Sequence, residues 1–194
     1  MSKKILFVID MQNDFIDGSL GSEEAKKIVP NVVKLIESFD QDQMIWYTQD
    51  THFENDVSFH NYKDTLEGKM LPIQHCIYKT QGWEINDDIQ KTIRNHKNFY
   101  GLVKGFQKRT FGCINMIKEA SLYLWENPKS EDEIHICGLC TDICVISNAL
   151  LLRAQFPNLH IYCYENCCAG TSKEAHDAAM LIMKMNQIEV CNFN

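Results

Sequence analysis

Short apolar runs alternate with longer stretches of helical periodicity along the chain. The run at residues 5–9 is continuous, which is typical of a strand buried on both faces of a parallel sheet. The first run, Ile-Leu-Phe-Val-Ile, ends directly at Asp10. The pattern predicts strands at residues 5–9, 44–48, 99–103, 134–137, 159–163 and 188–191.

Helical periodicity fills several intervals between these runs. Ser22 is placed to cap a helix that opens with Glu23 and Glu24, and apolar residues follow on one face at positions 28, 29, 32, 33 and 36. Further helices are predicted at 112–125 and 142–154. Thr171-x-x-Glu174 is a capping-box signature that opens the last predicted helix.

Strands that alternate with helices predict an α/β fold, a three-layer α/β/α arrangement around a six-stranded parallel sheet. No repeat or linker interrupts residues 1–194, so we expect a single domain. The irregular stretch 50–83 is longer than a connection usually is, which is typical of functional loops. Sites in open α/β sheets form at the carboxyl ends of the strands, so polar residues just after strands are the candidates.

Composition excludes several classes of protein. Lys and Arg together number 19 and Asp and Glu 26, which gives a formal net charge of −7 and no electrostatic footprint for nucleic acid or an anionic membrane. No run of about eighteen apolar residues, as a membrane span needs, is present. The N-terminal apolar run reaches Asp10 too soon for a signal peptide. We therefore expect a cytoplasmic protein with no nucleic-acid or membrane partner.

Nine cysteines are spread irregularly along the chain. Without a secretory signal a disulfide framework is not expected, and most of these thiols are interpreted as small apolar fillers. Cys137-x-x-Cys140 has the spacing of a zinc knuckle or a redox pair, but the sequence has no second matched pair to complete a structural zinc site.

Polar residues follow the first two predicted strands. Asp10 either caps a turn or serves as a functional carboxylate. Asp50-x-His52 places a carboxylate and an imidazole where both could reach one divalent metal. His60 and His75, in the long irregular stretch, are candidates for a third ligand, and a surface position is preferred for His60.

Two further candidates follow the third and fourth strands. Lys104 is either solvated or placed to hold an anionic partner. Cys144 falls in the first turn of a predicted helix, where free backbone N–H groups and the helix dipole favour a thiolate, so it is either a buried filler or a nucleophile. The sequence has no Gly-x-Ser-x-Gly elbow and no Gly-rich phosphate loop, which disfavours a serine hydrolase and a nucleotide-binding protein.

Four segments together resemble the isochorismatase-like cysteine hydrolase family and, within it, the nicotinamidase-related branch. They are Val8-Ile9-Asp10-Met11-Gln12-Asn13-Asp14-Phe15, Thr48-Gln49-Asp50-Thr51-His52, Leu102-Val103-Lys104 and Gly138-Leu139-Cys140-Thr141-Asp142-Ile143-Cys144-Val145. The resemblance covers nearly the whole chain and implies the family's strand order, 3-2-1-4-5-6. That order would leave Lys104 two strands from Asp10, roughly 10 Å at the usual strand spacing.

The resemblance also implies catalytic roles. Asp10, Lys104 and Cys144 match the family's triad of aspartate, lysine and cysteine. The family makes its oxyanion hole from the backbone N–H groups that match Cys140 and Cys144, with a cis peptide bond before the former. The bond between Leu139 and Cys140 is therefore expected to be cis.

A divalent metal is implied by the same resemblance, with Asp50, His52 and His75 as ligands. His75 matches the histidine of the family's Pro-x-His-Cys element. Zinc is the expected ion, and manganese, iron or cobalt would also suit these ligands. Phe15 and Phe111 are expected to line the substrate pocket. Because the family often forms oligomers, a homo-oligomer is expected.

The implied reaction is the hydrolysis of a small amide such as nicotinamide, a step of NAD salvage, to the carboxylic acid and ammonia through a thioester. Nicotinamidases usually carry tryptophan where this chain has Leu71, and one extra residue separates Pro72 from His75. An alternative is therefore a cysteine amidase for a carbamoyl or ureido compound, with no metal. A third reading is a non-catalytic metal-binding or redox-sensing protein built on Cys137 and Cys140.

Overall fold

The computed structural model describes residues 2–53, 66–96, 102–125 and 131–194. Its centre is a six-stranded parallel sheet in the order β3-β2-β1-β4-β5-β6. The predicted parallel sheet and its strand order are therefore confirmed. The strands are β1 (Lys4–Ile9), β2 (Met44–Asp50), β3 (Val103–Lys108), β4 (Glu133–Leu139), β5 (His160–Ala169) and β6 (Glu189–Cys191).

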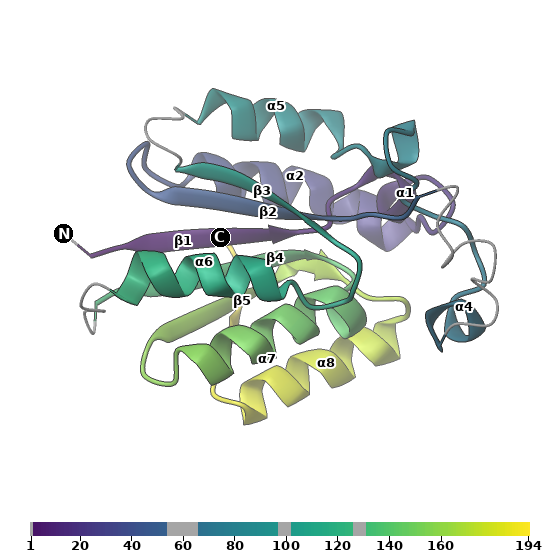
Figure 1. The fold of residues 1–194 in the computed structure, drawn as a ribbon. Coiled ribbons are helices and arrows are strands. Elements are labelled where there is room, and N and C mark those ends of the chain that lie inside the picture. Colours follow the sequence, from purple (N-terminus) through teal and green to yellow (C-terminus); the bar gives the residue numbers. More distant parts are fainter. Residues whose placement is uncertain (1, 54–65, 97–101, 126–130) are drawn as a thin grey trace.

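Helices cover both faces of the sheet and make the three expected layers (Figure 1). One face carries α2 (Glu23–Glu37) and α5 (Asp87–Asn95), and the other carries α6 (Ile114–Trp125), α7 (Ile146–Gln155) and α8 (Lys173–Met185). Near the carboxyl end of β1 lie α1 (Asn13–Ile16) and α4 (Leu66–Met70). The short turns are η2 (Gln81–Trp83) and η3 (Thr141–Val145). None of the described helices is long and apolar enough to cross a membrane.

The hydrophobic core is centred on β1, whose residues 5–9 have no exposed surface. Helix α2 packs beside the sheet through its buried apolar face, and its first turn is capped as predicted, because Ser22 Oγ accepts a hydrogen bond from Ala25 N (3.0 Å). Burying one large aliphatic side chain, such as those of β1 and α2, contributes about 1.5–3 kcal/mol to the free energy of unfolding. The core therefore holds the carboxyl ends of the central strands in fixed positions.

The third strand lies later in the sequence than its predicted range, 99–103. Residues 99–101 lie outside the described part of the chain, and the described strand pairs with β2 from Val103, opposite Ile45, to Lys108, opposite Asp50. Phe106 and Lys108 are buried and alternate with exposed neighbours, as in a strand with one covered face. Because this strand is not a continuous apolar run, its pattern is weaker than that of β1.

The predicted capping box of the last helix is wrong by one residue. Ser172, and not Thr171, is the cap of α8, since its Oγ accepts a hydrogen bond from Ala175 N (3.1 Å). The Thr171 hydroxyl instead donates to Asp142 Oδ2 (2.6 Å). The start of α8 is thereby tied to η3.

Candidate active site and metal centre

Asp10 lies where β1 ends and the chain turns. Its φ is +45°, a left-handed conformation that aspartate adopts more readily than most residues. The Thr48 hydroxyl accepts a hydrogen bond from Asp10 N (3.1 Å) and donates to Asp10 Oδ1 (2.7 Å). These two bonds fix the carboxylate and leave Oδ2 to face a cation.

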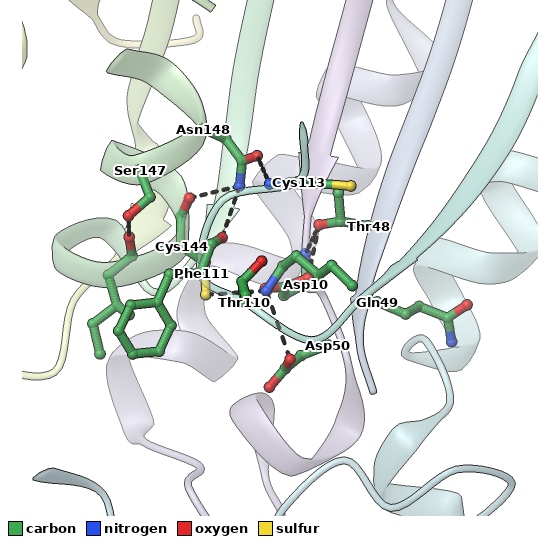
Figure 2. Close-up of polar contacts among 12 residues, drawn as sticks. Asp10, Thr48, Gln49, Asp50, Thr110, Phe111, Cys113, Cys144, Ser147 and Asn148 are labelled. Carbon is green, nitrogen blue, oxygen red and sulfur yellow. Dashed lines mark hydrogen bonds and ion pairs between the residues drawn. The ribbon is translucent and has the colours of Figure 1, made fainter. Parts of the chain in front are cut away.

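That cation is the ammonium group of Lys108, the last residue of β3. Its Nζ lies 2.7 Å from Asp10 Oδ2, 3.4 Å from Cys144 Sγ and 3.8 Å from Asp50 Oδ1. Figure 2 shows Asp10, Asp50 and Cys144 gathered around this point. The Lys108 side chain is only 2% exposed, so the ion pair is shielded from water. One buried lysine therefore joins the ends of β1, β2 and η3.

The prediction that Lys104 joins Asp10 and Cys144 is wrong. Lys104 lies near the start of β3, where its Nζ pairs with a Glu119 carboxylate oxygen (2.8 Å) and its side chain is 41% exposed. Lys104 and Lys108 face the same side of the strand, but four residues of strand separate them by about 13 Å. β2 lies between β3 and β1 in the sheet. The Lys108 side chain extends past the end of β2 and so reaches Asp10.

Cys144 lies in η3, directly after β4, and is buried. The peptide bond between Leu139 and Cys140 is cis, as predicted. The N–H groups of Ile143 and Val145 donate to the Cys140 carbonyl (3.1 Å each), so the turn that carries the nucleophile candidate begins at this bond. The predicted single helix over 142–154 is divided into η3 and α7.

Burial and neighbouring charges act in opposite directions on these groups. Burial raises the pKa of the Cys144 thiol well above its ordinary value, and the positive charge of Lys108 opposes only part of this. Burial also raises the pKa of Asp10, against the influence of Lys108. Burial disfavours the Lys108 ammonium, but the charges of Asp10, Cys144 and Asp50 prevail, and its pKa is raised. Cys144 therefore rests as a thiol beside a ready-made counter-ion.

Asp50, His52 and His75 form a buried group whose potential ligand atoms all lie within 4.8 Å of one another. Asp50 Oδ2 is 3.1 Å from His52 Nε2 and 3.2 Å from His75 Nε2. His75 Nδ1 lies 2.7 Å from the Ile73 carbonyl, a contact that fixes the ring and leaves Nε2 for a metal. His60 lies outside the described residues.

The ligand set fits the predicted ion. Burial raises the pKa of Asp50, but hydrogen bonds with His52 and His75 and the charge of Lys108 lower it by more, so this carboxyl is held ionised. One carboxylate oxygen and two imidazole nitrogens suit zinc, manganese or iron. Three protein ligands leave room for an exchangeable ligand, as in catalytic sites.

The two predicted pocket residues contact different parts of the site. Phe15 is buried, with its ring centroid 5.5 Å from that of His75. Phe111 is 42% exposed, and its carbonyl accepts a hydrogen bond from Asn148 Nδ2 (3.2 Å), which also donates to the Cys144 carbonyl (2.8 Å) (Figure 2). Phe15 is therefore beside a metal ligand and Phe111 beside the nucleophile candidate. Their contact with substrate stays a prediction.

The Cys137-x-x-Cys140 pair does not form a metal site among the described residues. Two clusters of side chains in this part of the chain could hold a metal, and neither contains a cysteine. Cys137 has no exposed surface, and burial raises its pKa well above the ordinary value. Burial raises the pKa of Cys140 to about 12. Neither thiol is therefore activated as a redox pair requires.

A second group, Glu165, His176 and Asp177, lines a cavity of about 460 Å³ between α2 and α8. Asp177 is already paired with Lys173 Nζ (2.6 Å), and His176 Nδ1 lies 2.8 Å from Thr141 Oγ1. These three residues are half-buried or exposed, unlike the buried group of Asp50, His52 and His75, so we assign no metal here.

Sequence reasoning missed Lys108 and did not single out the polar residues that hold the site together: Gln12, Asp14, Thr48 and Asn148. Phe106, an apolar residue beyond the predicted end of this strand, is a signal that the strand continues and that Lys108 lies near its end. Asn148 lies one helical turn after Cys144, a spacing that also places it near the nucleophile candidate. The other residues are recognisable only from their contacts.

The chain is similar to known proteins over most of its length. A family model described as "Isochorismatase domain" matches residues 4–193. A nicotinamidase from Saccharomyces cerevisiae is 28% identical over 174 residues, which are 76% of this chain and 80% of that protein.

Solved structures with the same fold include two relevant proteins. A nicotinamidase/pyrazinamidase from Bacillus subtilis has a TM-score of 0.79 and 28% identity, over 98% of this chain and 100% of that one. A pyrazinamidase from Pyrococcus horikoshii, solved in complex with zinc, has a TM-score of 0.74 and 24% identity, over 98% and 99%. The second comparison shows similarity of fold.

Proposed function

The chain belongs to the isochorismatase family, and from that premise we propose that it is a cysteine amidohydrolase that converts a small amide to a carboxylic acid and ammonia. Nicotinamide is the proposed substrate, which would make the reaction a step of NAD salvage. The proposal is supported by two contacts of the buried Lys108 ammonium group, one with the Asp10 carboxylate and one with the Cys144 sulfur.

The reaction begins with the thiol of Cys144, which burial keeps protonated until a base removes the proton. Asp10 accepts this proton, and the sulfur attacks the carbonyl carbon of the amide. The backbone N–H groups of Cys140 and Cys144 stabilise the oxyanion of the tetrahedral intermediate. Asp10 then returns the proton to the departing nitrogen, so that ammonia leaves and a thioester remains on Cys144.

Water completes the reaction by attacking the thioester. Asp10, ionised again, takes a proton from this water as it adds to the carbonyl carbon. Collapse of the second tetrahedral intermediate releases the carboxylic acid, and the proton on Asp10 returns to the Cys144 sulfur. Lys108 stabilises the anionic form of Asp10 and the thiolate in turn, since it lies within reach of both.

Asp50, His52 and His75 would hold the divalent metal, for which zinc, manganese and iron are the proposed ions. When bound, the metal would supply a Lewis acid for the ring nitrogen of an aryl amide, and Asp50, His52 and His75 would thereby help to orient the substrate. Phe15, which packs against His75, would form an apolar wall on that side.

A second candidate function is an amidase of the same family with a carbamoyl or ureido substrate. The observation that favours it is Leu71, which stands where the family's nicotinamidases carry tryptophan. Leu71 is half-buried in the segment that leads to His75. Such an enzyme would use Cys144 in the same way and would not depend on the metal.

The two functions are tested by ammonia release from nicotinamide and from a panel of carbamoyl amino acids. We expect release from nicotinamide that Cys144→Ala lowers at least about a thousandfold. We also expect that a metal chelator inhibits the native protein and that added zinc restores it. Release only from the carbamoyl compounds, without inhibition by the chelator, would favour the second function. Equal release by the native protein and Cys144→Ala would contradict both.

A further inference from the structure

Gln12 is fully buried two residues after Asp10, and within the described part of the chain its side chain bonds to backbone groups. Its Oε1 accepts a hydrogen bond from Asp50 N (2.7 Å), and its Nε2 donates to Asp50 O (2.9 Å) and to Trp83 O (2.8 Å). The amide thus satisfies both backbone groups of a metal-ligand candidate, as a neighbouring strand would. Loss of these bonds would leave buried polar groups of the backbone unpaired, which destabilises this arrangement.

Asp14 makes the corresponding contact on the opposite side of the metal centre. Its Oδ2 accepts a hydrogen bond from Cys76 N (2.7 Å) and its Oδ1 accepts one from Ser19 N (3.2 Å). Cys76 directly follows His75 and has a φ of +48°, a conformation that needs external support in a residue other than glycine. Gly82 leaves room for this carboxylate, since a Cβ there would lie 2.2 Å from Asp14 Oδ2.

Together the two side chains hold both loops that carry metal-ligand candidates. Gln12 fixes the end of β2 at Asp50, and Asp14 fixes the backbone just after His75. The two residues lie on one short segment that begins at Asp10, and Phe15 of the same segment packs on the His75 ring. One segment therefore sets the distance between the proton acceptor and the metal centre.

We propose that Gln12 and Asp14 are positioning residues of the metal centre, which act through the backbones of Asp50 and Cys76. This inference rests on the metal site of the proposed function. Outer partners of this kind typically alter metal affinity about 10–100-fold when they are removed. Neither residue touches the Cys144 sulfur in the structure, so their effect on the nucleophile is expected to be small.

Asp14→Asn is the informative variant, because the asparagine has the same shape but only one acceptor oxygen. It can serve the N–H of Ser19 or of Cys76, but not both. Asp17→Asn, at an exposed aspartate three residues along, is the matched control. Gln12→Met, of similar size, removes all three bonds of Gln12 and tests the other loop. Because Gln12→Met removes hydrogen bonds from three backbone groups and so also lowers the stability of the fold, Asp14→Asn decides the outcome.

Zinc affinity is measured by competition with a chromophoric chelator, and the site-specific component is the part that His52→Ala removes. The second readout is the rate of Cys144 alkylation by iodoacetamide, followed by peptide mass mapping. We expect Asp14→Asn to weaken the site-specific affinity at least about tenfold while the alkylation rate stays within about twofold. Asp17→Asn should change neither.

Each other outcome overturns the inference in a recognisable way. If the native protein and His52→Ala bind zinc equally, or neither binds it, the proposed metal site is wrong, and so are the positioning roles of Gln12 and Asp14. If the native protein binds zinc and Asp14→Asn binds it equally well, only the positioning role is wrong. If Asp14→Asn alters zinc affinity and alkylation alike, its role is general stability of the fold.

Discussion

Single residues at the strand ends adopt conformations that few side chains tolerate, and these conformations set the site's geometry. Asp10 turns the chain at φ +45°, and Gly138 turns it at φ +126° on the neighbouring strand. A Cβ on Gly138 would lie 2.1 Å from the Ile9 carbonyl oxygen, far inside van der Waals contact. The glycine therefore lets β4 approach β1 closely and brings Cys144 towards Asp10.

Gly138→Ala should lower the free energy of unfolding by about 3 kcal/mol or more, since it combines positive φ with a backbone clash. Gly112→Ala is the control, because a Cβ there would lie 2.6 Å from Leu151 Cδ1, the far end of a flexible side chain. Urea denaturation of both variants measures the effect. Equal losses of stability would show that Gly138 has no special backbone role.

The residue scale also shows how far sequence reasoning reaches. Asp10 directly follows an apolar run, and Asp50 and His52 lie within four residues of the end of the next predicted strand, so their position at the carboxyl edge of the sheet could be predicted. Lys108 was missed, because Lys104, Gly105 and Gln107 interrupt the apolar pattern of β3 and the strand was predicted to end at residue 103. The predicted Lys104 is on the correct face of β3, but four residues too early.

At the scale of elements, β4 and β5 are joined by a stack of aromatic rings outside the site. His135 on β4 stacks with Tyr162 and Tyr164, and Phe39 packs edge-on against it. His135 Nδ1 lies 2.9 Å from the Tyr164 hydroxyl, and Nε2 lies 3.1 Å from Glu133 Oε2. Burial lowers the pKa of His135 in spite of Glu133.

This pKa shift makes the stability of the protein depend on pH. Below about pH 6.5 this histidine becomes protonated in the unfolded chain, but in the folded chain its lowered pKa keeps it neutral to a lower pH. The free energy of unfolding therefore falls as the pH drops. Of the charged groups that face the ring, Glu133 favours its protonation and Lys4 opposes it.

We expect His135→Gln to flatten the loss of unfolding free energy between pH 7.5 and about 5.5, a slope that one histidine limits to about 1.4 kcal/mol per pH unit. Urea titrations of the native protein and the variant at several pH values measure both slopes. An unchanged slope in the variant would show that other groups cause the acid sensitivity.

Across the whole molecule, the site lies where the direction of strand addition reverses. The chain adds β2 and β3 on one side of β1, and then β4, β5 and β6 on the other. Such a switch point opens a crevice at the carboxyl ends of the central strands. Asp10 and the turn that carries Cys144 follow the two strands that meet there, while Lys108 arrives from the edge strand.

The alternating pattern was sufficient to predict the parallel sheet and its three layers, because a strand such as β1 that is buried on both faces is a continuous apolar run. The strand order was implied by the family resemblance. The exact ends of β3, β5 and α8 could not be predicted, since strand register and helix caps depend on tertiary contacts such as that of Thr171 with Asp142. Element types were therefore more predictable than the contacts between side chains.

The central claim is that Lys108, with Asp10 and Cys144, forms the hydrolytic centre. Ammonia release by Lys108→Met and Lys104→Met, each checked for native secondary structure by circular dichroism, tests it most directly. Lys108→Met should lose at least about a hundredfold in kcat, because Asp10 and the thiolate lose their shared cation. Lys104→Met breaks a half-exposed pair with Glu119, which contributes about 0–1 kcal/mol to stability, and removes the ammonium group from above the Trp46 and Phe106 rings. It should keep kcat within about twofold. A folded Lys108→Met variant with native kcat, or an equal loss in both variants, would contradict the account.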